Sequence, residues 1–210
     1  MDTLSELGIC NLALGWLGAN RITSFDDNLV EAQLCKDNYG PILRALLEVS
    51  EWTFAQHRFK PPAESTPPDW GYASQFKIPA TVLRIHYVGL SDRKEEDDPA
   101  PVWNRASPIG IGDVIECDAS VIYCRGTRMV EDVSKLSGLF GQAMAARIAA
   151  DLAMPLTNSR GMASDMWTLF SNKIVEAERM DSKQGRARVL RAPGMLQARL
   201  AGGNTIGPNV

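Results

Sequence analysis

Large apolar residues recur at every third or fourth position through two runs near the end of the chain. This spacing places them on one face of an α-helix in each run, and a short polar stretch separates the runs. The pattern predicts a helical hairpin over 132–183, with helices over 133–153 and 160–183. The apolar positions are Leu136, Phe140, Ala143 or Met144, Ile148 and Leu152, followed by Met162, Met166, Phe170, Ile174 and Ala177.

The residues between the two runs predict where the helices end and begin. Pro155 is expected to stop the first helix, because the residue before a proline disfavours helical backbone angles. Asn158 or Ser159 is expected to cap the second helix. The face opposite the apolar stripe of the first helix is mostly Ala, Gly and Ser. This hairpin is expected to serve as a scaffold, since it carries no catalytic group.

The amino-terminal part of the chain predicts two more helices, over 3–17 and 29–50. Thr3 and Glu6 have the spacing of a capping box, and Gly18 is expected to end the first helix. For the second helix, Asn28 is the expected cap. A proline also falls inside its apolar pattern, at position 41, and predicts a kink, with a complete break as the alternative.

Between the two helical pairs, the pattern changes to short alternating or apolar stretches. Two of them flank Asp118-Ala119, which predicts a hairpin. The fold class expected from this arrangement is α+β, mainly α, with an antiparallel helical bundle and a small β insertion over about 76–125. The chain would be one domain over 1–183, followed by an extended, flexible arm over 184–210. The expected strands are 81–88, 102–105, 114–117 and 120–124.

Composition narrows the possible functions. The chain has 210 residues, of which 45% are hydrophobic and 22% charged, and its net charge is −3. A dedicated nucleic-acid-binding protein is usually basic, so that class is disfavoured. No apolar run approaches the roughly 20 residues that span a bilayer, so no contact with a membrane is expected. The acidic amino-terminus begins a helix directly, which is not the pattern of a signal peptide.

Candidate chemistry is sparse. The four cysteines form no C-x-x-C pair and are expected to be buried thiols, and the two histidines, His57 and His86, adjoin no nucleophile motif. Trp52 and Phe54, or Trp70 and Tyr72, could stack on bases, but both pairs lack interleaved basic residues, which favours core packing. The acidic run Glu95, Glu96, Asp97 and Asp98 lacks the glycine-centred spacing of an EF-hand and is expected to be a solvated loop. No enzymatic activity, metal or organic cofactor is therefore expected.

The last 27 residues, 184–210, have a different composition from the rest. They carry four arginines and no acidic residue, so this segment is +4 and residues 1–183 are −7. One interpretation is a frayed terminus. The other is an arm that becomes ordered on a partner, which is favoured by five large apolar residues: Val189, Leu190, Met195, Leu196 and Leu200.

Several stretches, taken in order, resemble the tail tubular protein A family, the head-to-tail adaptors of short-tailed bacteriophages. The resemblance covers roughly residues 4–183. Pro41 departs from the family's helical pattern, and the basic tail has no residue-level match. The matching stretches are Asn11 to Gly18 with Ile22 to Phe25, Tyr39 to Leu47 with Trp52 to Ala55, Trp70 to Ala73 with Phe76 to Pro79 and Val82 to Arg84, and Ala145 to Thr157.

The resemblance implies a structural virion protein rather than an enzyme. Such subunits form a ring, expected to be a dodecamer, that joins the portal protein to the tail nozzle or a tubular protein B-like component. Genomic DNA would pass through the ring without specific binding, and an acidic wall suits that passage because it does not trap phosphates. The protein would be made in the bacterial host cytoplasm and reside in the virion tail at the portal vertex.

Two groups of residues are the candidate sites. The first is a portal-docking arm comprising Arg186, Arg188, Val189, Leu190, Arg191, Met195, Leu196 and Arg199. The second comprises loops that would face the channel or the tail: Glu95, Glu96, Asp97, Asp98 and Asp118. The alternatives are another connector component, such as a stopper or tail terminator, a DNA-binding protein that uses the basic tail, and, last, a wall-degrading enzyme of the phage particle.

Overall fold

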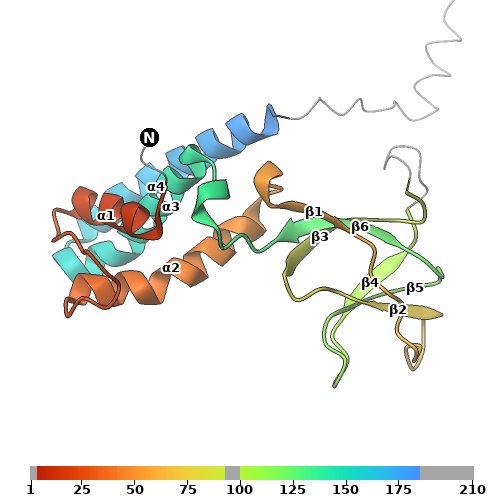
Figure 1. Ribbon diagram of the computed structural model, residues 1–210. Coiled ribbons are helices and arrows are strands. Elements are labelled where there is room, and N and C mark those ends of the chain that lie inside the picture. Colours follow the sequence, from red (N-terminus) through yellow and green to blue (C-terminus); the bar gives the residue numbers. More distant parts are fainter. Residues whose placement is uncertain (1–3, 93–99, 185–210) are drawn as a thin grey trace, which may run out of the picture.

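The computed structural model describes residues 4–92 and 100–184, and it places a helical body at one end and two small sheets at the other (Figure 1). We call these two parts the helical body and the β region. The helices are α1 (Glu6–Leu17), α2 (Val30–Val49), α3 (Gly138–Thr157) and α4 (Arg160–Ser182), with 3-10 turns η1 (Thr53–Ala55) and η2 (Val133–Lys135). The strands are β1 (Gln56–Phe59), β2 (Ser74–Lys77), β3 (Val82–Gly89), β4 (Trp103–Ala106), β5 (Val114–Cys117) and β6 (Tyr123–Arg128).

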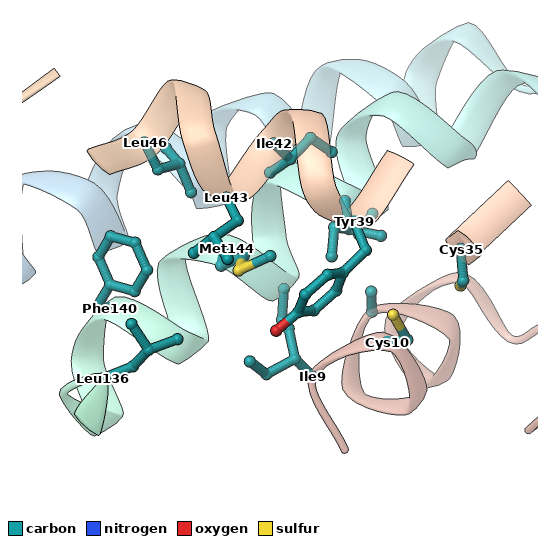
Figure 2. Packing of buried hydrophobic residues seen from close by; sticks show 14 of the residues in the cluster. Ile9, Cys10, Cys35, Tyr39, Ile42, Leu43, Leu46, Leu136, Phe140 and Met144 are labelled. Atoms are coloured by element: carbon teal, nitrogen blue, oxygen red, sulfur yellow. The ribbon is translucent and has the colours of Figure 1, made fainter. Parts of the chain in front are cut away.

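Helix α3 is the centre of the helical body and contacts α1, α2 and α4. Eleven of its 20 residues are buried, and six of the eleven are alanines, so neighbouring helices approach it closely. A methyl group at Gly141 would lie only 2.5 Å from the Leu4 side chain, which shows how tight this packing is. Figure 2 shows Phe140 and Met144 of α3 facing apolar side chains of α2, and these contacts form the main core.

The helix ends partly follow the sequence prediction. Gly18 ends α1 in the left-handed conformation (φ 69°), as expected, and Ser159 caps α4 by accepting a hydrogen bond from the Met162 amide. The N-cap of α1 is Ser5, whereas the expected cap, Thr3, lies outside the described residues. The expected cap of α2 at Asn28 is wrong, because Leu29 occupies that position without a side-chain hydrogen bond.

Neither internal proline breaks its helix. Helix α2 continues through Pro41, and α3 continues through Pro155 to Thr157, so the predicted stop at Pro155 is wrong. Each proline forfeits one backbone hydrogen bond, and burial of the surrounding apolar residues outweighs that local cost. Helix α3 ends instead at Asn158, whose left-handed conformation (φ 50°) reverses the chain into α4.

The β region contains two three-stranded antiparallel sheets. One has the order β1-β6-β3 and the other β2-β5-β4. Residues between them form a second, smaller core around Phe76, Ile115 and Ile122. Strand β6 approaches β3 so closely at Gly126 that a Cβ atom there would lie 2.3 Å from the Arg84 carbonyl oxygen.

The predicted fold class is wrong. Over the described residues the chain is 47% helix and 18% strand, a mixed α/β fold and not a helical bundle with a small β insertion. The strands extend from residue 56 to residue 128, beyond the expected limits of 76 and 125. The edge strand β1 comes from the aromatic segment after α2, and only its long-range pairing with β6 makes it a strand.

The predicted hairpin around Asp118-Ala119 is also wrong. Strand β5 pairs with β2 and β4, whereas β6 pairs with β1 and β3, so the two strands that flank this turn belong to different sheets. Both strands are largely buried, and an apolar stretch of this kind does not identify its partner.

Candidate interaction surfaces

A groove of about 640 Å³ opens on the β2-β5-β4 sheet, and we call it the Trp70 groove. Its floor includes Gln75, Glu116 and Asn104, which lie opposite one another across the three strands. Alternate residues of these strands point to the other face and form the small core. The groove therefore lies on the face of the sheet that the core does not use.

Two loops form the walls of the Trp70 groove. One contains Trp70 and Tyr72, and the other contains Pro108 and Ile109. Glycines with positive φ shape both loops: Gly71 at 94°, Gly110 at 84° and Gly112 at 91°. The Trp70 side chain is 87% exposed and Ile109 is fully exposed, so the two loops present large apolar groups to solvent.

Hydrogen bonds hold the loops in place. The Ala73 amide donates to Asp118 Oδ1 at 3.0 Å, and Gln75 Nε2 donates to the Thr66 carbonyl at 2.6 Å. Asp118, predicted to face the channel or the tail, is thus positioned to order the Trp70 loop.

The second loop is held by an ion pair at its base. Arg105 Nη2 lies 2.6 Å from Asp113 Oδ2, and Ser107 Oγ donates to the other oxygen at 2.7 Å. The hydrogen bond from Arg105, followed by that from Ser107, lowers the pKa of Asp113 below its ordinary value. The charged form of this carboxylate is therefore favoured by the contacts that join the two ends of the loop.

The charged residues that line the Trp70 groove are all acidic. Asp69 and Glu116 are its two carboxylates, and no lysine or arginine is among the lining residues. Aromatic and proline side chains beside two negative charges suit an extended ligand that carries both apolar and cationic groups.

A second exposed surface runs along α4. Trp167, Val175 and Met180 are each at least 41% exposed. The Arg147 guanidinium lies 4.3 Å from the centre of the Trp167 ring and 5.6 Å from that of Phe170, in a cation–π arrangement. Arg147 Nε also lies 3.0 Å from Asp151 Oδ2, so the guanidinium that stacks on these rings is ion-paired.

The carboxyl-terminal end of α4 is tied to the start of the β region. Asp181 is buried, and its Oδ2 accepts hydrogen bonds from the Thr53 amide at 2.8 Å and the Thr53 hydroxyl at 2.7 Å. Its Oδ1 has no hydrogen-bond partner within the described part of the chain. Thr53 opens η1, which leads directly into β1, so residues 184–210 begin beside the junction of the two parts.

A polar cluster occupies the same junction. Glu51 lies 2.8 Å from Arg125 Nη1 and 3.3 Å from His86 Nδ1, and the other His86 nitrogen is 2.7 Å from the Thr127 hydroxyl. Burial raises the pKa of Glu51, but the Arg125 hydrogen bond and the charges of His86 and Arg125 outweigh it, and the net pKa is lowered. The cluster joins α2 to the sheet and is not arranged around a cavity.

The described residues offer little catalytic chemistry. Over 4–92 and 100–184, no group of three or more His, Cys, Asp or Glu side chains could hold a metal ion. The four cysteines are free and buried, as expected. Contact with Cys35 raises the pKa of the Cys10 thiol, and burial raises that of Cys124 to about 12, so neither is a ready nucleophile. None of the described helices is long and apolar enough to cross a bilayer.

Most of the predicted site residues lie outside the described residues. This applies to Glu95, Glu96, Asp97 and Asp98 and to the docking-arm residues Arg186, Arg188, Val189, Leu190, Arg191, Met195, Leu196 and Arg199. The structure therefore places Asp118 alone among them.

Sequence reasoning missed the Trp70 groove. Core packing of Trp70 was the expected arrangement, and it is wrong, because the side chain is exposed. Trp52 and Phe54, read in the same way, do pack in the main core. A signal was available: Trp70 and Ile109 each stand next to glycine and near proline, in loops that have no apolar periodicity and hence no buried face.

Comparison with known proteins adds no assignment: no protein-family model matches this chain, and no curated protein is significantly similar to it.

Proposed function

We propose that this chain is a structural subunit of a bacteriophage head-to-tail connector, an adaptor that forms a ring between the portal and the tail. The observation that carries the proposal is the presence of two uncovered apolar surfaces on different parts of one chain. One is the Trp70 groove of the β region, and the other is the set of exposed apolar side chains along α4, those of Trp167, Val175 and Met180. A ring subunit between two stacked components needs contact surfaces on more than one side.

The distribution of buried residues supports a scaffold rather than an enzyme. The helical hairpin of α3 and α4 is the rigid centre of the fold, and α3 contributes its side chains to packing. The titratable clusters of the described residues join structural elements to one another. The stretches that resemble tail tubular protein A lie on both the helical body and the β region, so the proposal concerns the whole chain.

The charge of the chain supports a conduit for DNA. Residues 1–183 carry −7, and like charge keeps a passing duplex from adhering to the wall of the ring. Genomic DNA would therefore move through the channel without specific binding. The positive residues 184–210 would instead contact protein, with Arg186, Arg188 and Arg191 on an acidic surface of the portal.

The direct test is sedimentation velocity of the purified protein, alone and mixed with portal rings encoded by the same genome. The expected result is transfer of the protein into the portal peak, saturating at a fixed number of copies per ring, with twelve implied by the resemblance. Absence of transfer at concentrations well above those of assembly would overturn the adaptor function.

A truncated variant that ends at Lys183 separates the role of the carboxyl-terminal segment from that of the body. Both hydrophobic cores are formed by residues before Lys183, so circular dichroism should show that the variant keeps its fold. It should no longer transfer into the portal peak. Full transfer by the truncated variant would mean that the body, and not this segment, binds the portal.

A further inference from the structure

The Trp70 groove exposes apolar surface that a soluble chain would be expected to cover. Trp70 is 87% exposed and Ile109 is fully exposed, and they stand on two loops held in fixed positions by hydrogen bonds. The charged groups of the lining are the carboxylates of Asp69 and Glu116. An occupant should therefore be extended, apolar in part and positively charged.

Residues 184–210 of the same chain have this chemistry. The segment carries four arginines and no acidic residue. The sequence preference of the residue before Pro193 is for extended backbone angles, which suits a groove walled by aromatic and proline side chains. Its large apolar residues stand among the arginines: Val189, Leu190, Met195, Leu196 and Leu200.

The start of this segment lies close to the β region. Asp181 is hydrogen-bonded to Thr53, three residues before strand β1 begins. The 26 residues that follow Gln184 can span at most about 90 Å. The longest strand of the β region has eight residues and a length of about 26 Å, so the segment can reach the groove with chain to spare.

The groove is a better match for this segment than the exposed apolar side chains along α4. On α4, Arg147 already lies over the rings of Trp167 and Phe170, so these rings are not free to stack on a further arginine. Tethering also favours docking within one chain, because a short connection gives an effective concentration in the millimolar range.

We infer that in the free subunit the Trp70 groove holds the carboxyl-terminal segment of its own chain, with Arg191 and Arg199 at the rim formed by Asp69 and Glu116. The inference goes beyond the proposed function, because it concerns the protein before it meets any partner. It implies that transfer of the segment to another surface uncovers the groove.

Photo-cross-linking of the full-length protein tests this arrangement. A p-benzoyl-phenylalanine replaces Ile109, whose side chain is fully exposed on the wall of the groove. Protein with natural isotopes is mixed with an equal amount of fully ¹⁵N-labelled protein at low micromolar concentration and irradiated. Mass spectrometry should find cross-links from position 109 to residues 185–200, with both peptides carrying the same isotope label.

A control photo-cross-linker at Val30 reports on chance encounters. Val30 is 67% exposed and begins α2 in the helical body. It should give at most about a tenth of the yield obtained at position 109, because tethering alone does not hold the segment there. Equal yields at the two positions would show that the segment has no preferred site and would overturn the inference.

Charge variants test the chemistry of docking. Arg191→Glu combined with Arg199→Glu should lower the cross-link yield from position 109 by about tenfold. Adding Asp69→Lys and Glu116→Lys should restore much of that yield, since the charges are then exchanged. The circular dichroism spectrum should stay unchanged in each case, because Asp69 and Glu116 lie outside the two cores and the two arginines lie outside the described residues.

Two outcomes would overturn the inference in different ways. Cross-links between differently labelled chains would make a second copy the donor of the segment. An absence of cross-links to residues 185–200, together with unchanged yields in the charge variants, would leave the groove without this occupant. Neither result depends on the portal, so failure here is distinct from failure of the sedimentation test.

Discussion

The helical body and the β region are stabilised to very different extents. Among the described residues, the main core contains 27 buried hydrophobic residues, whereas the core between the two sheets contains eight. The β region also displays the most exposed apolar side chains, those of Trp70, Val102 and Ile109. The helical body should therefore be the more stable part, and the β region should be the part that opens first.

The largest loss of stability should follow truncation of a large side chain in the main core. Phe140 is fully buried and packs edge-on against Trp52 at 5.0 Å and Phe54 at 5.2 Å. Phe140→Ala should lower the free energy of unfolding by about 3–5 kcal/mol, as measured by denaturant titration. Met154→Ala, at a 40% exposed position on the same helix, should cost less than about 1 kcal/mol. Similar costs at the two sites would contradict the assignment of α3 as the central helix.

The next effect should be confined to the β region. Gly126→Ala places a methyl group 2.3 Å from the Arg84 carbonyl oxygen, and this backbone contact can be relieved only by separating β3 from β6. The expected cost is about 2–3 kcal/mol. Hydrogen exchange should show lost protection in β3 and β6, with α3 unchanged. Loss of protection throughout the chain would mean that the two parts unfold as one unit.

A matched glycine-to-alanine variant in the helical body should raise the free energy of unfolding instead of lowering it. Gly15 lies in α1, and nothing lies within 4 Å of the position that a Cβ atom would take. Gly15→Ala should therefore raise the free energy of unfolding by about 0.5–1 kcal/mol, because alanine loses less backbone entropy on folding. If Gly15→Ala were destabilising, another part of the molecule would have to contact α1 at position 15.

The hydrogen bonds that connect the helical body to the β region should contribute an intermediate amount to the free energy of unfolding. Thr53→Val removes the hydroxyl that donates to buried Asp181 and leaves that carboxylate with the backbone amide alone. The expected cost is about 1–2 kcal/mol in denaturant unfolding. Asp181→Asn in the same background should recover part of the loss, since a neutral amide is cheaper to bury than a carboxylate. If Asp181→Asn restored no stability, the negative charge of Asp181 would not be the source of the destabilisation by Thr53→Val.

Acid should weaken the same junction. The lowered pKa of Glu51 means that its carboxylate form is favoured in the folded state. This contribution is therefore complete above the unfolded pKa of a glutamate and is lost as the pH falls through the lower folded pKa. Because half of the side chain is exposed, the effect is small. Glu51→Gln should flatten the decline of unfolding free energy with acid, and an unchanged slope would contradict this origin.

The smallest effect on stability should come from substitution of Trp70. Trp70→Ser removes a side chain that is 87% exposed, so the free energy of unfolding should change by less than about 0.5 kcal/mol. Trp52→Ser, in the main core, should unfold far more easily, because the buried Trp52 ring also donates to the Leu46 carbonyl at 2.8 Å. Comparable destabilisation by both variants would mean that Trp70 is covered in the folded protein.

The positions of the helices were determined by the sequence itself. The apolar spacing that placed helices near 133–153 and 160–183 arises from neighbours three and four residues apart, and so it can be read locally. The same holds for Gly18 and Ser159, which act through backbone groups of their own helices. Burial of the cysteines followed from their apolar surroundings.

Tertiary structure alone decided the features that depend on distant partners. Strands β5 and β6 adjoin one another in the chain, yet they belong to different sheets, because each pairs with segments tens of residues away. Packing also carried α3 through Pro155, against the local preference of the backbone. Trp70 is exposed while Trp52 is buried, although both lie in aromatic stretches, since the folded chain provides a cavity for only one of them. Pairing and burial are non-local, and a pattern within one segment does not encode them.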